Sequence, residues 1–331
     1  MSIFENKNIL ITGGTGSFGK NFAKYILQNH NPAKLIIFSR DELKQQRMKN
    51  ELKDSRLRFF LGDVRELLRL QRAFHGVDII VHAAALKQVP MLEYNPYEAV
   101  KTNILGSQNV IEAAIDNGVD KVLLVSTDKA VQPVNLYGAT KLCAEKLFIN
   151  GNAYSTGKTK LGVVRYGNVL GSRGSIVEIL LKNREVTVVD LTHEEMTRFW
   201  ITLEQSFELV RFALEHMVGG EIFVPKIPSM KLVDLFEALV PKAQRRVVGI
   251  RPGEKIHEAL LTETEVRHSL ELQDYYLVLP EQSEIFNIKS RFSKYFEMGA
   301  PLAGGFVYTS NSNSRWLTPG DLQALIRNLE L

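Results

Sequence analysis

Short apolar runs alternate with segments of helical spacing along the first half of the chain. The apolar runs lie at residues 8–12, 35–38, 57–61, 78–81, 121–125 and 161–165. Apolar positions with helical spacing follow the first run at Phe18, Phe22 and Ile26, and a longer helix is predicted at 96–117. Strands that alternate with helices form parallel sheets covered by helices on both faces. The pattern therefore predicts an α/β fold with a doubly wound parallel sheet.

The second half of the chain carries shorter and more mixed elements. Strands are predicted at 221–224 and 246–250, and helices at 176–181, 203–217, 230–239 and 321–330. The sequence shows no linker-like segment that separates this half from the first. We therefore predict a sheet domain over residues 1–165 and a smaller mixed α/β region over residues 166–331, with an interleaved boundary.

Composition and charge exclude several classes of protein. Of the 331 residues, 45% are hydrophobic and 24% are charged, which is ordinary for a globular protein. The net charge is +4 and the sequence has no basic stripe of the kind that binds nucleic acid. It also lacks a membrane-length apolar run and a signal-peptide profile, and its single cysteine, Cys143, excludes an internal disulfide. We expect a cytoplasmic protein without a metal, nucleic-acid or membrane partner.

A glycine-rich loop joins the first predicted strand to the first predicted helix. Gly13, Gly16 and Gly19 form the pattern G-x-x-G-x-x-G. Glycines at this place let the backbone turn tightly and approach a pyrophosphate, and they aim the helix N-terminus at it. The strand, the loop and the helix together predict a dinucleotide site and a Rossmann-like sheet.

The ends of the next strands refine the cofactor. The second strand ends in Ser39-Arg40, and a hydroxyl with a guanidinium suits a 2′-phosphate, whereas an acidic residue would suit NAD. We therefore predict NADP. Asp63 ends the third strand, where an adenine amino group would be met. Small residues follow the structural His82, and Lys87 lies just beyond them, within reach of the cofactor or a phosphate.

Tyr137 and Lys141 lie four residues apart and therefore share one face of a helix. A lysine ammonium beside a phenol lowers the phenol's pKa from its reference of about 10. Tyr137 is thus a candidate base for a sugar or alcohol hydroxyl, and Thr127 is a candidate hydrogen-bond partner of the same hydroxyl.

Later loops carry candidate anion-binding groups. Residues 166–175 form a polar, glycine-rich loop that opens the helix predicted at 176–181. Basic residues recur in loops at Arg198, Lys226 and Arg251. Several such cations would bind a diphosphate if they converged.

Seven motifs in this order resemble one family. They are Gly-Gly-Thr-Gly-Ser-Phe-Gly at 13–19, Ser-Arg-Asp-Glu-Leu-Lys at 39–44, Ser-Thr-Asp-Lys-Ala at 126–130, Tyr-Gly-Ala-Thr-Lys at 137–141, Arg-Tyr-Gly-Asn-Val at 165–169, Met-Thr-Arg-Phe-Trp at 196–200 and Arg-Pro-Gly-Glu-Lys at 251–255. Together they resemble the inverting UDP-N-acetylglucosamine 4,6-dehydratases of the extended short-chain dehydrogenase/reductase superfamily, from residue 8 to residue 316. The resemblance implies a tightly held NADP, UDP-N-acetylglucosamine as substrate, and a homo-oligomer, with a hexamer among the candidates. It also implies a first step in pseudaminic acid synthesis and flagellin glycosylation.

The resemblance carries site residues over to this sequence. It implies cofactor binding by Gly13, Thr15, Gly16, Ser17, Phe18, Gly19, Ser39, Arg40, Asp41, Glu42, Leu43, Lys44, Asp63, Val64, Ala83, Lys87, Thr102, Tyr137, Lys141 and Val169. It implies substrate binding by Lys87, Asn168, Arg173, Gly174, Ser175, Thr197, Arg198, Arg251 and Glu254. The sequence departs from the family pattern at Gln88, where many members have histidine, and at 191–195, which we leave without a role.

The resemblance also implies the chemistry. Tyr137 takes the 4-hydroxyl proton, and Lys129 removes the proton from carbon 5. Asp128 is the acid that helps the 6-hydroxyl to leave, which requires a raised pKa. Lys129 must be neutral to act as a base, and we expect burial and the cationic oxidised nicotinamide to lower its pKa. The group that reprotonates carbon 5 stays open. A retaining 4,6-dehydratase and a 4-epimerase that needs only the Tyr-Lys pair remain alternatives.

Overall fold

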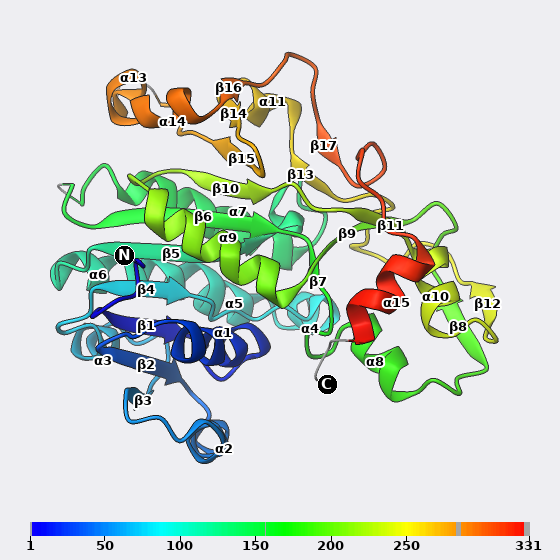
Figure 1. Cartoon of the computed structure of the whole chain (residues 1–331), viewed down its shortest axis with the longest axis horizontal. Coiled ribbons are helices and arrows are strands. Elements are labelled where there is room, and N and C mark those ends of the chain that lie inside the picture. The colour runs from blue at the N-terminus through cyan, green and yellow to red at the C-terminus, as the bar shows by residue number, and fades with distance from the viewer. Residues whose placement is uncertain (1, 156, 283–285, 328–331) are drawn as a thin grey trace.

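A ten-stranded sheet runs through the computed structural model, which describes residues 2–155, 157–282 and 286–327 (Figure 1). Its parallel strands, in spatial order, are β3 (Leu57–Leu61), β2 (Lys34–Ser39), β1 (Asn8–Thr12), β4 (Ile79–His82), β5 (Lys121–Thr127), β6 (Lys160–Tyr166) and β10 (Ile222–Pro225). Three antiparallel strands, β15 (Tyr275–Val278), β14 (Ser269–Glu271) and β16 (Ala300–Pro301), extend the edge. The order 3-2-1-4-5-6 is that of a Rossmann-like sheet, so the predicted fold class is confirmed.

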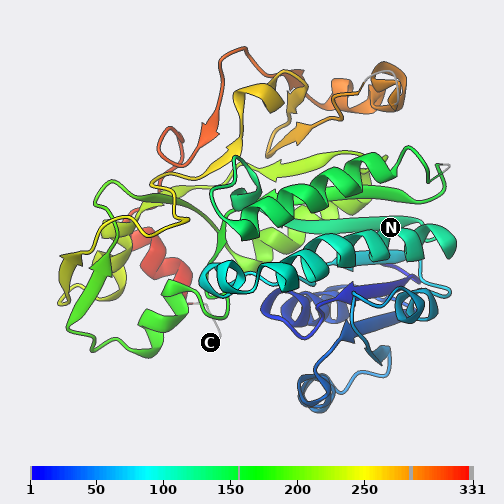
Figure 2. The same cartoon turned by 180° about the vertical axis from the view of Figure 1, so that it is seen from behind.

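Helices cover both faces of this sheet. On one face lie α1 (Ser17–Asn29) and α9 (Leu203–His216), whose aromatic side chains Phe22 and Phe207 meet with ring centroids 5.4 Å apart. The opposite face, turned to the viewer in Figure 2, carries α6 (Gly106–Asp116) and α7 (Leu136–Gly151). The remaining helices of this part are α2 (Glu42–Leu52), α3 (Leu67–Ala73), α4 (Val89–Tyr94) and α5 (Pro96–Ala99). Burial from both sides explains why the strands read as continuous apolar runs.

The helix predicted at 96–117 contains an irregular turn. It runs as α5, a π-helical turn at Val100–Leu105 and α6. Asn103, which lies in this turn, is 1% exposed. Its side-chain amide donates to the Leu86 carbonyl and accepts from the Leu86 N–H, each at 2.9 Å. The π-helical turn therefore fixes the segment that leaves β4, as such turns often do at functional sites.

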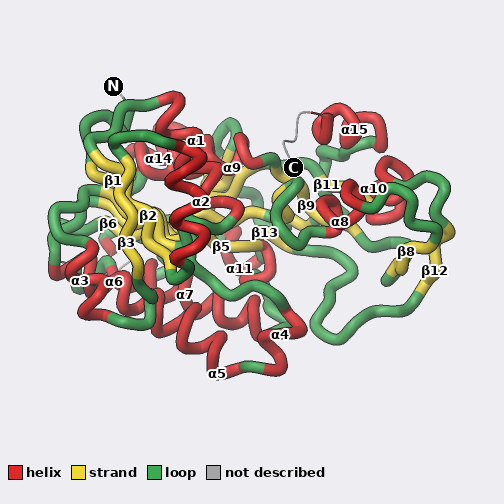
Figure 3. Tube along the Cα trace, turned by 90° about the horizontal axis from the view of Figure 1, so that it is seen from below, coloured by secondary structure: helices red, strands yellow, loops and turns green. Residues whose placement is uncertain are grey.

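The smaller region forms a second lobe beside the sheet, as Figure 3 shows from below. It contains the sheet β7 (Asn168–Val169), β9 (Thr197–Ile201) and β11 (Ser229–Lys231), and the parallel pair β8 (Val188–Leu191) and β12 (Gln244–Val247). Its helices are α8 (Ile176–Lys182), α10 (Leu232–Leu239) and α15 (Pro319–Arg327). Trp200, Met230 and Leu322 belong to its separate apolar core.

Several predicted bounds in this half were wrong. The strand predicted at 246–250 is β12 at Gln244–Val247, and the helix predicted from 230 begins at Leu232 because Ser229–Lys231 pairs with β9. The last helix, predicted from residue 321, already includes Pro319 and continues to at least Arg327, and residues 328–330 of that prediction lie outside the described residues. Late strands such as β10 and β15 join the first sheet, so the two halves of the chain interleave.

The other short elements lie along the upper edge in Figure 1 or in the site. They are β13 (Ala259–Leu261), β17 (Tyr308–Thr309), α11 (Glu263–Val266), α13 (Ile288–Arg291), α14 (Ser293–Met298) and a 3-10 turn at Asp128–Ala130. No helix among the residues that the structure describes is long and apolar enough to cross a membrane.

Candidate active site

The glycine loop packs against the end of β4. Gly13 has a φ of +65°, and a β-carbon on it would lie 2.8 Å from the backbone of Ala84. Gly16 is the N-cap of α1 and offers no side chain to the free N–H groups of the first turn. The loop can therefore approach a ligand with backbone donors, at the positive end of a helix of 13 residues.

A cavity of about 280 Å³ opens beside this loop. Predicted cofactor residues that line it are Gly13, Thr15, Gly16, Ser39, Arg40, Asp41, Lys44, Asp63, Val64, Ala83 and Thr102. The hydroxyl of Thr102 is buried and has no hydrogen-bond partner among the described residues. An unpaired buried hydroxyl, small residues and free backbone donors fit a dinucleotide.

Cations lie on the rim of the cavity at the end of β2. The Arg40 side chain is 52% exposed and its guanidinium lies 3.5 Å from Asp63. Lys44 pairs with Asp41 at 2.8 Å, and Asp41 also caps α2. Arg40 and Lys44 are thus cations on the rim of the cavity, each beside a carboxylate, where an anionic group such as a phosphate could meet them.

Other predicted cofactor residues do not line this cavity. They are Ser17, Phe18, Gly19, Glu42, Leu43, Lys87, Tyr137, Lys141 and Val169. The Phe18 ring stacks on Phe22, 5.3 Å between centroids, and Leu43 is 59% exposed. A β-carbon on Gly19 would lie 2.6 Å from Gly14, so this glycine serves the packing of α1 on the loop.

Tyr137 and Lys141 lie on α7 as predicted, but their electrostatics differ from the prediction. Burial raises the pKa of Tyr137 to about 12, with Lys129 and the hydroxyl of Thr127 acting in the other direction. Lys141 is 3% exposed, its ammonium donates to the Val125 carbonyl at 2.8 Å, and burial lowers its pKa to about 8. The charge that favours the Tyr137 phenolate is therefore that of Lys129, and the expected lowering of the phenol's pKa by Lys141 was wrong.

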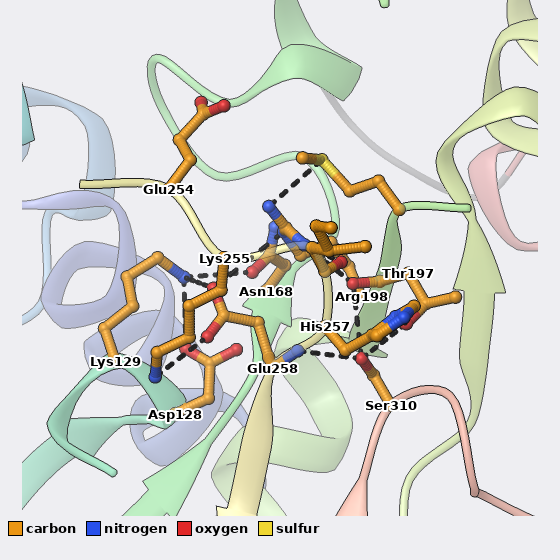
Figure 4. A network of polar contacts seen from close by, with 12 residues as sticks. Asp128, Lys129, Asn168, Thr197, Arg198, Glu254, Lys255, His257, Glu258 and Ser310 are labelled. Carbon is orange, nitrogen blue, oxygen red and sulfur yellow. Dashed lines mark hydrogen bonds and ion pairs between the residues drawn. The ribbon is translucent and has the colours of Figure 1, made fainter. Parts of the chain in front are cut away.

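Lys129 lies between two carboxylates. Its ammonium is 3.1 Å from Asp128 and 3.6 Å from Glu258, and it also donates to Asn168 Oδ1 at 3.5 Å (Figure 4). Burial acts to lower the pKa of Lys129, but Asp128 and Glu258 outweigh it and raise that pKa above its ordinary value. Burial alone therefore does not lower the pKa of Lys129, because Glu258, which the sequence does not place beside it, adds a second negative charge.

Asp128 is fully buried beside Lys129. Its Oδ1 accepts from the Thr127 hydroxyl at 2.9 Å and from Lys129, whereas Oδ2 has no partner among the described residues. A buried carboxylate oxygen without a partner, in the turn that follows β5, is one that a hydroxyl group could satisfy.

Two predicted substrate-binding residues, Thr197 and Arg198, lie on β9 and face different surroundings. The Thr197 hydroxyl is taken by His257 at 2.8 Å and Ser310 at 2.6 Å, and its side chain faces the protein interior. Arg198 lies 3.9 Å from Glu258 and donates to the carbonyls of Thr197 and Ile256 (Figure 4). Arg198 belongs to the cluster around Lys129, and Thr197 supports it from behind.

The loop after β7 reaches the glycine loop. The Arg173 N–H donates to Ser17 Oγ at 3.1 Å, and Lys87 donates to the Arg173 carbonyl at 3.5 Å. Gly174 has a φ of +73°, and Ser175 caps α8. The structure thus brings predicted cofactor and substrate residues to one edge of the sheet.

Arg251 and Glu254 lie on the loop that leads to β13. Arg251 is 57% exposed and lies 4.0 Å from Glu254, whose side chain points away from the cluster in Figure 4. The Gly253 carbonyl accepts from Asn135, the N-cap of α7, at 2.8 Å. This hydrogen bond ties the loop to the helix that carries Tyr137.

Comparison with known proteins identifies the family. The family described as polysaccharide biosynthesis protein matches residues 9–280. The UDP-N-acetylglucosamine 4,6-dehydratase (inverting) of Campylobacter jejuni is 46% identical over 99% of both chains. This chain belongs to the same family. The UDP-glucose 4-epimerase of Rickettsia conorii is 39% identical over 99% of this chain and 97% of its own. The crystal structure of Pen from Bacillus thuringiensis is 35% identical, with a TM-score of 0.88 and 98% of each chain covered.

Three residues of the site were not predicted from the sequence. They are Asn103, Lys255 and Glu258, and each acts through contacts between distant segments. Asn103 donates to Thr140 on α7 at 3.0 Å, and Lys255 donates to the Val131 carbonyl at 2.6 Å. The motif at 251–255 ends in Lys255, three residues before Glu258, and was the one available signal for both.

Proposed function

We propose that the protein is an inverting UDP-N-acetylglucosamine 4,6-dehydratase that uses NADP. The observation that carries the proposal is the placement of the Asp128-Lys129 pair next to Tyr137, with an unpartnered carboxylate oxygen on Asp128. A 4-epimerase needs the tyrosine but has no use for an acid and an amine beside it. The Campylobacter relative, at 46% identity, carries this activity in its name.

The cavity residues support the cofactor assignment. The glycine loop and Thr102 would hold the dinucleotide, and Arg40 and Lys44 would meet the 2′-phosphate. When bound, NADP would accept a hydride from carbon 4 of the sugar and later return that hydride to carbon 6. All other steps fall to side chains of the site.

We assign the proton transfers at the sugar to three side chains of the site. Tyr137 takes the 4-hydroxyl proton as phenolate, which the Lys129 charge and the Thr127 hydroxyl favour against burial. The 4-ketone acidifies the proton on carbon 5, and Lys129 takes that proton as the free amine. Asp128, once it has taken up a proton, donates that proton to the 6-hydroxyl, so the C6–O bond breaks and water leaves. Because Lys129 is held as an ammonium, elimination should become faster as pH rises.

The remaining assignments rest on the resemblance and on the cations of the site. Lys87, Arg173, Arg198 and Arg251 would contact the diphosphate or the sugar, together with Asn168. We propose that the enzyme is a cytoplasmic homo-oligomer and that its product enters pseudaminic acid synthesis.

Proton NMR of the purified protein with UDP-N-acetylglucosamine in heavy water, without added cofactor, tests the function. We expect a 6-deoxy-4-keto sugar with deuterium on carbon 5 and the L-arabino configuration. A D-xylo ketone as the first product would make the enzyme a retaining dehydratase. A 4-epimer that keeps its 6-hydroxyl would place it with the Rickettsia relatives. The Lys129→Ala variant should retain bound NADP and lose elimination.

A further inference from the structure

Glu258 is a buried carboxylate that no motif of the sequence assigns. It lies directly before β13 and is 3% exposed. Its N–H donates to Ser310 Oγ at 2.9 Å, and the same hydroxyl meets Thr197. The backbone on both sides is thereby fixed, so the Glu258 side chain has a defined direction into the cluster (Figure 4).

Three cations surround this carboxylate. Oε1 lies 3.6 Å from Lys129 Nζ and 3.9 Å from Arg198 Nε, and Oε2 lies 3.6 Å from Lys255 Nζ. These are ion-pair distances, and Oε2 accepts no hydrogen bond from the residues that the structure describes. Arg198 and Lys255 are also committed to backbone carbonyls. The three nearby cations offset part of the cost of burying this carboxylate.

Two carboxylates, Asp128 and Glu258, act on the Lys129 ammonium. The charged and titratable groups that act on Lys129 or respond to it are Asp128, Glu258, Arg198, Lys87 and Tyr137. Arg198 and Lys87 repel the ammonium, and Asn168 is neutral. Asp128 precedes Lys129 in the chain and is the proposed acid. Glu258 is therefore the anion that holds Lys129 without a part of its own in the chemistry.

We propose that Glu258 is a positioning residue that holds Lys129 as an ammonium and thereby sets the pH above which Lys129 takes the carbon 5 proton. The inference rests on the proposed function. A negative charge within 4 Å stabilises the ammonium, so its loss makes the free amine available at lower pH. Glu258 also directs the Lys129 ammonium toward Asn168, which lies on β7.

The test compares two half-reactions across pH in the NADP-loaded enzyme with UDP-N-acetylglucosamine. Oxidation at carbon 4 is followed by absorbance of the reduced nicotinamide in a single turnover. Loss of the carbon 5 proton is followed by deuterium uptake from heavy water, measured by mass spectrometry. In Glu258→Gln we expect the acid limb of deuterium uptake to move to lower pH by about one unit or more. The pH dependence of carbon 4 oxidation should move less.

Matched variants separate charge from packing. Glu271→Gln removes a carboxylate that pairs with Lys226 at 2.7 Å on an exposed rim, and should leave both profiles unchanged. Glu258→Asp keeps the charge and should restore the acid limb toward the wild-type pH. An acid limb that stays in place in Glu258→Gln, while deuterium uptake proceeds, would overturn the proposal.

A second measurement needs no folded variant at position 258. The ¹³Cε signal of Lys129 in the wild-type protein, identified by its absence from Lys129→Ala, should titrate at higher pH than those of exposed lysines. A signal that titrates at lower pH than theirs would also overturn the proposal. If the wild type forms no deuterated product, the proposed function fails, whereas this titration still decides whether carboxylates hold Lys129 charged.

Discussion

Gly138 lies so close to Lys129 that a β-carbon on residue 138 would come within 2.1 Å of the Lys129 carbonyl oxygen. Gly138 stands in the first turn of α7, directly after Tyr137, and its N–H donates to the N-cap Asn135 at 2.8 Å. The missing side chain allows the helix to bring Tyr137 against the turn that carries Asp128 and Lys129. The close approach of Tyr137 to Lys129, the two proposed bases, therefore requires a residue without a side chain at position 138.

Gly138→Ala should displace α7 from that turn. Forcing a methyl group into a packed contact costs about 1–3 kcal/mol of unfolding free energy. Turnover should fall further than stability, because Tyr137 moves relative to Lys129. Urea unfolding and product formation measure the two effects. Gly304→Ala is the matched control, since a β-carbon there meets nothing within 4 Å. Normal turnover in Gly138→Ala would show that the contact is not needed.

The buried Lys141 should make stability depend on pH. Burial lowers its pKa from 10.5 to about 8 in the folded protein. Between these values the unfolded chain binds the proton and the native state does not, so native stability rises with pH. Relative to Lys141→Met, the wild type should gain unfolding free energy as pH rises from 8 to 10.5. Urea unfolding of both proteins across this range measures the gain, and a constant difference would contradict it.

A buried ion pair holds the catalytic helix to the sheet. Arg165 is 1% exposed and lies 2.6 Å from Glu145 on α7 and 2.8 Å from Glu265. Arg165→Met leaves these carboxylates without their partner and should cost about 3–5 kcal/mol of unfolding free energy. Arg246→Met, which breaks an exposed pair with Asp190, should cost at most about 1 kcal/mol. Equal losses in the two variants would argue against the buried network.

Arg40 should set the choice between NADP and NAD. In Arg40→Asp, repulsion and the lost guanidinium should weaken NADP binding at least about tenfold and leave NAD binding the same or stronger. Isothermal titration with each dinucleotide measures both constants. Arg58→Asp changes an exposed arginine on the neighbouring strand β3, away from the cavity, and should alter neither. An unchanged preference in Arg40→Asp would remove Arg40 from the 2′-phosphate site.

The sheet was predictable because its strands are buried on both faces. All six apolar runs of the first half became strands, from β1 at Asn8–Thr12 to β6 at Lys160–Tyr166. The strands β7, β8, β9 and β11 of the smaller region were not predicted, because two to five residues carry little periodicity and tertiary pairing defines them. The bounds of β12 were predicted wrongly: its four residues are all exposed, and their only strand partner in the described residues is β8.

The candidate site was predictable where one motif carries it. The glycine loop and Ser39-Arg40 lie at strand ends as expected, and Tyr137 and Lys141 lie on one helix, α7. The charge of Lys129 was not predictable, because Glu258 approaches it from a segment far along the chain. Neither was the role of Asn103, since a π-helical turn leaves no mark in the spacing of apolar residues.

The ion pairs of Arg165 and Lys129 limit the order in which parts of the protein can form during translation. Their partners Glu265 and Glu258 leave the ribosome only after strands β1 to β6 have been made. A nascent chain that ends before residue 258 can pair its first six strands, but it carries a buried arginine and an active-site lysine without two of their counter-ions. The dinucleotide pocket can thus form early during translation, whereas the proton-transfer cluster forms late, so a nascent enzyme is able to bind its cofactor before it can release water from a sugar.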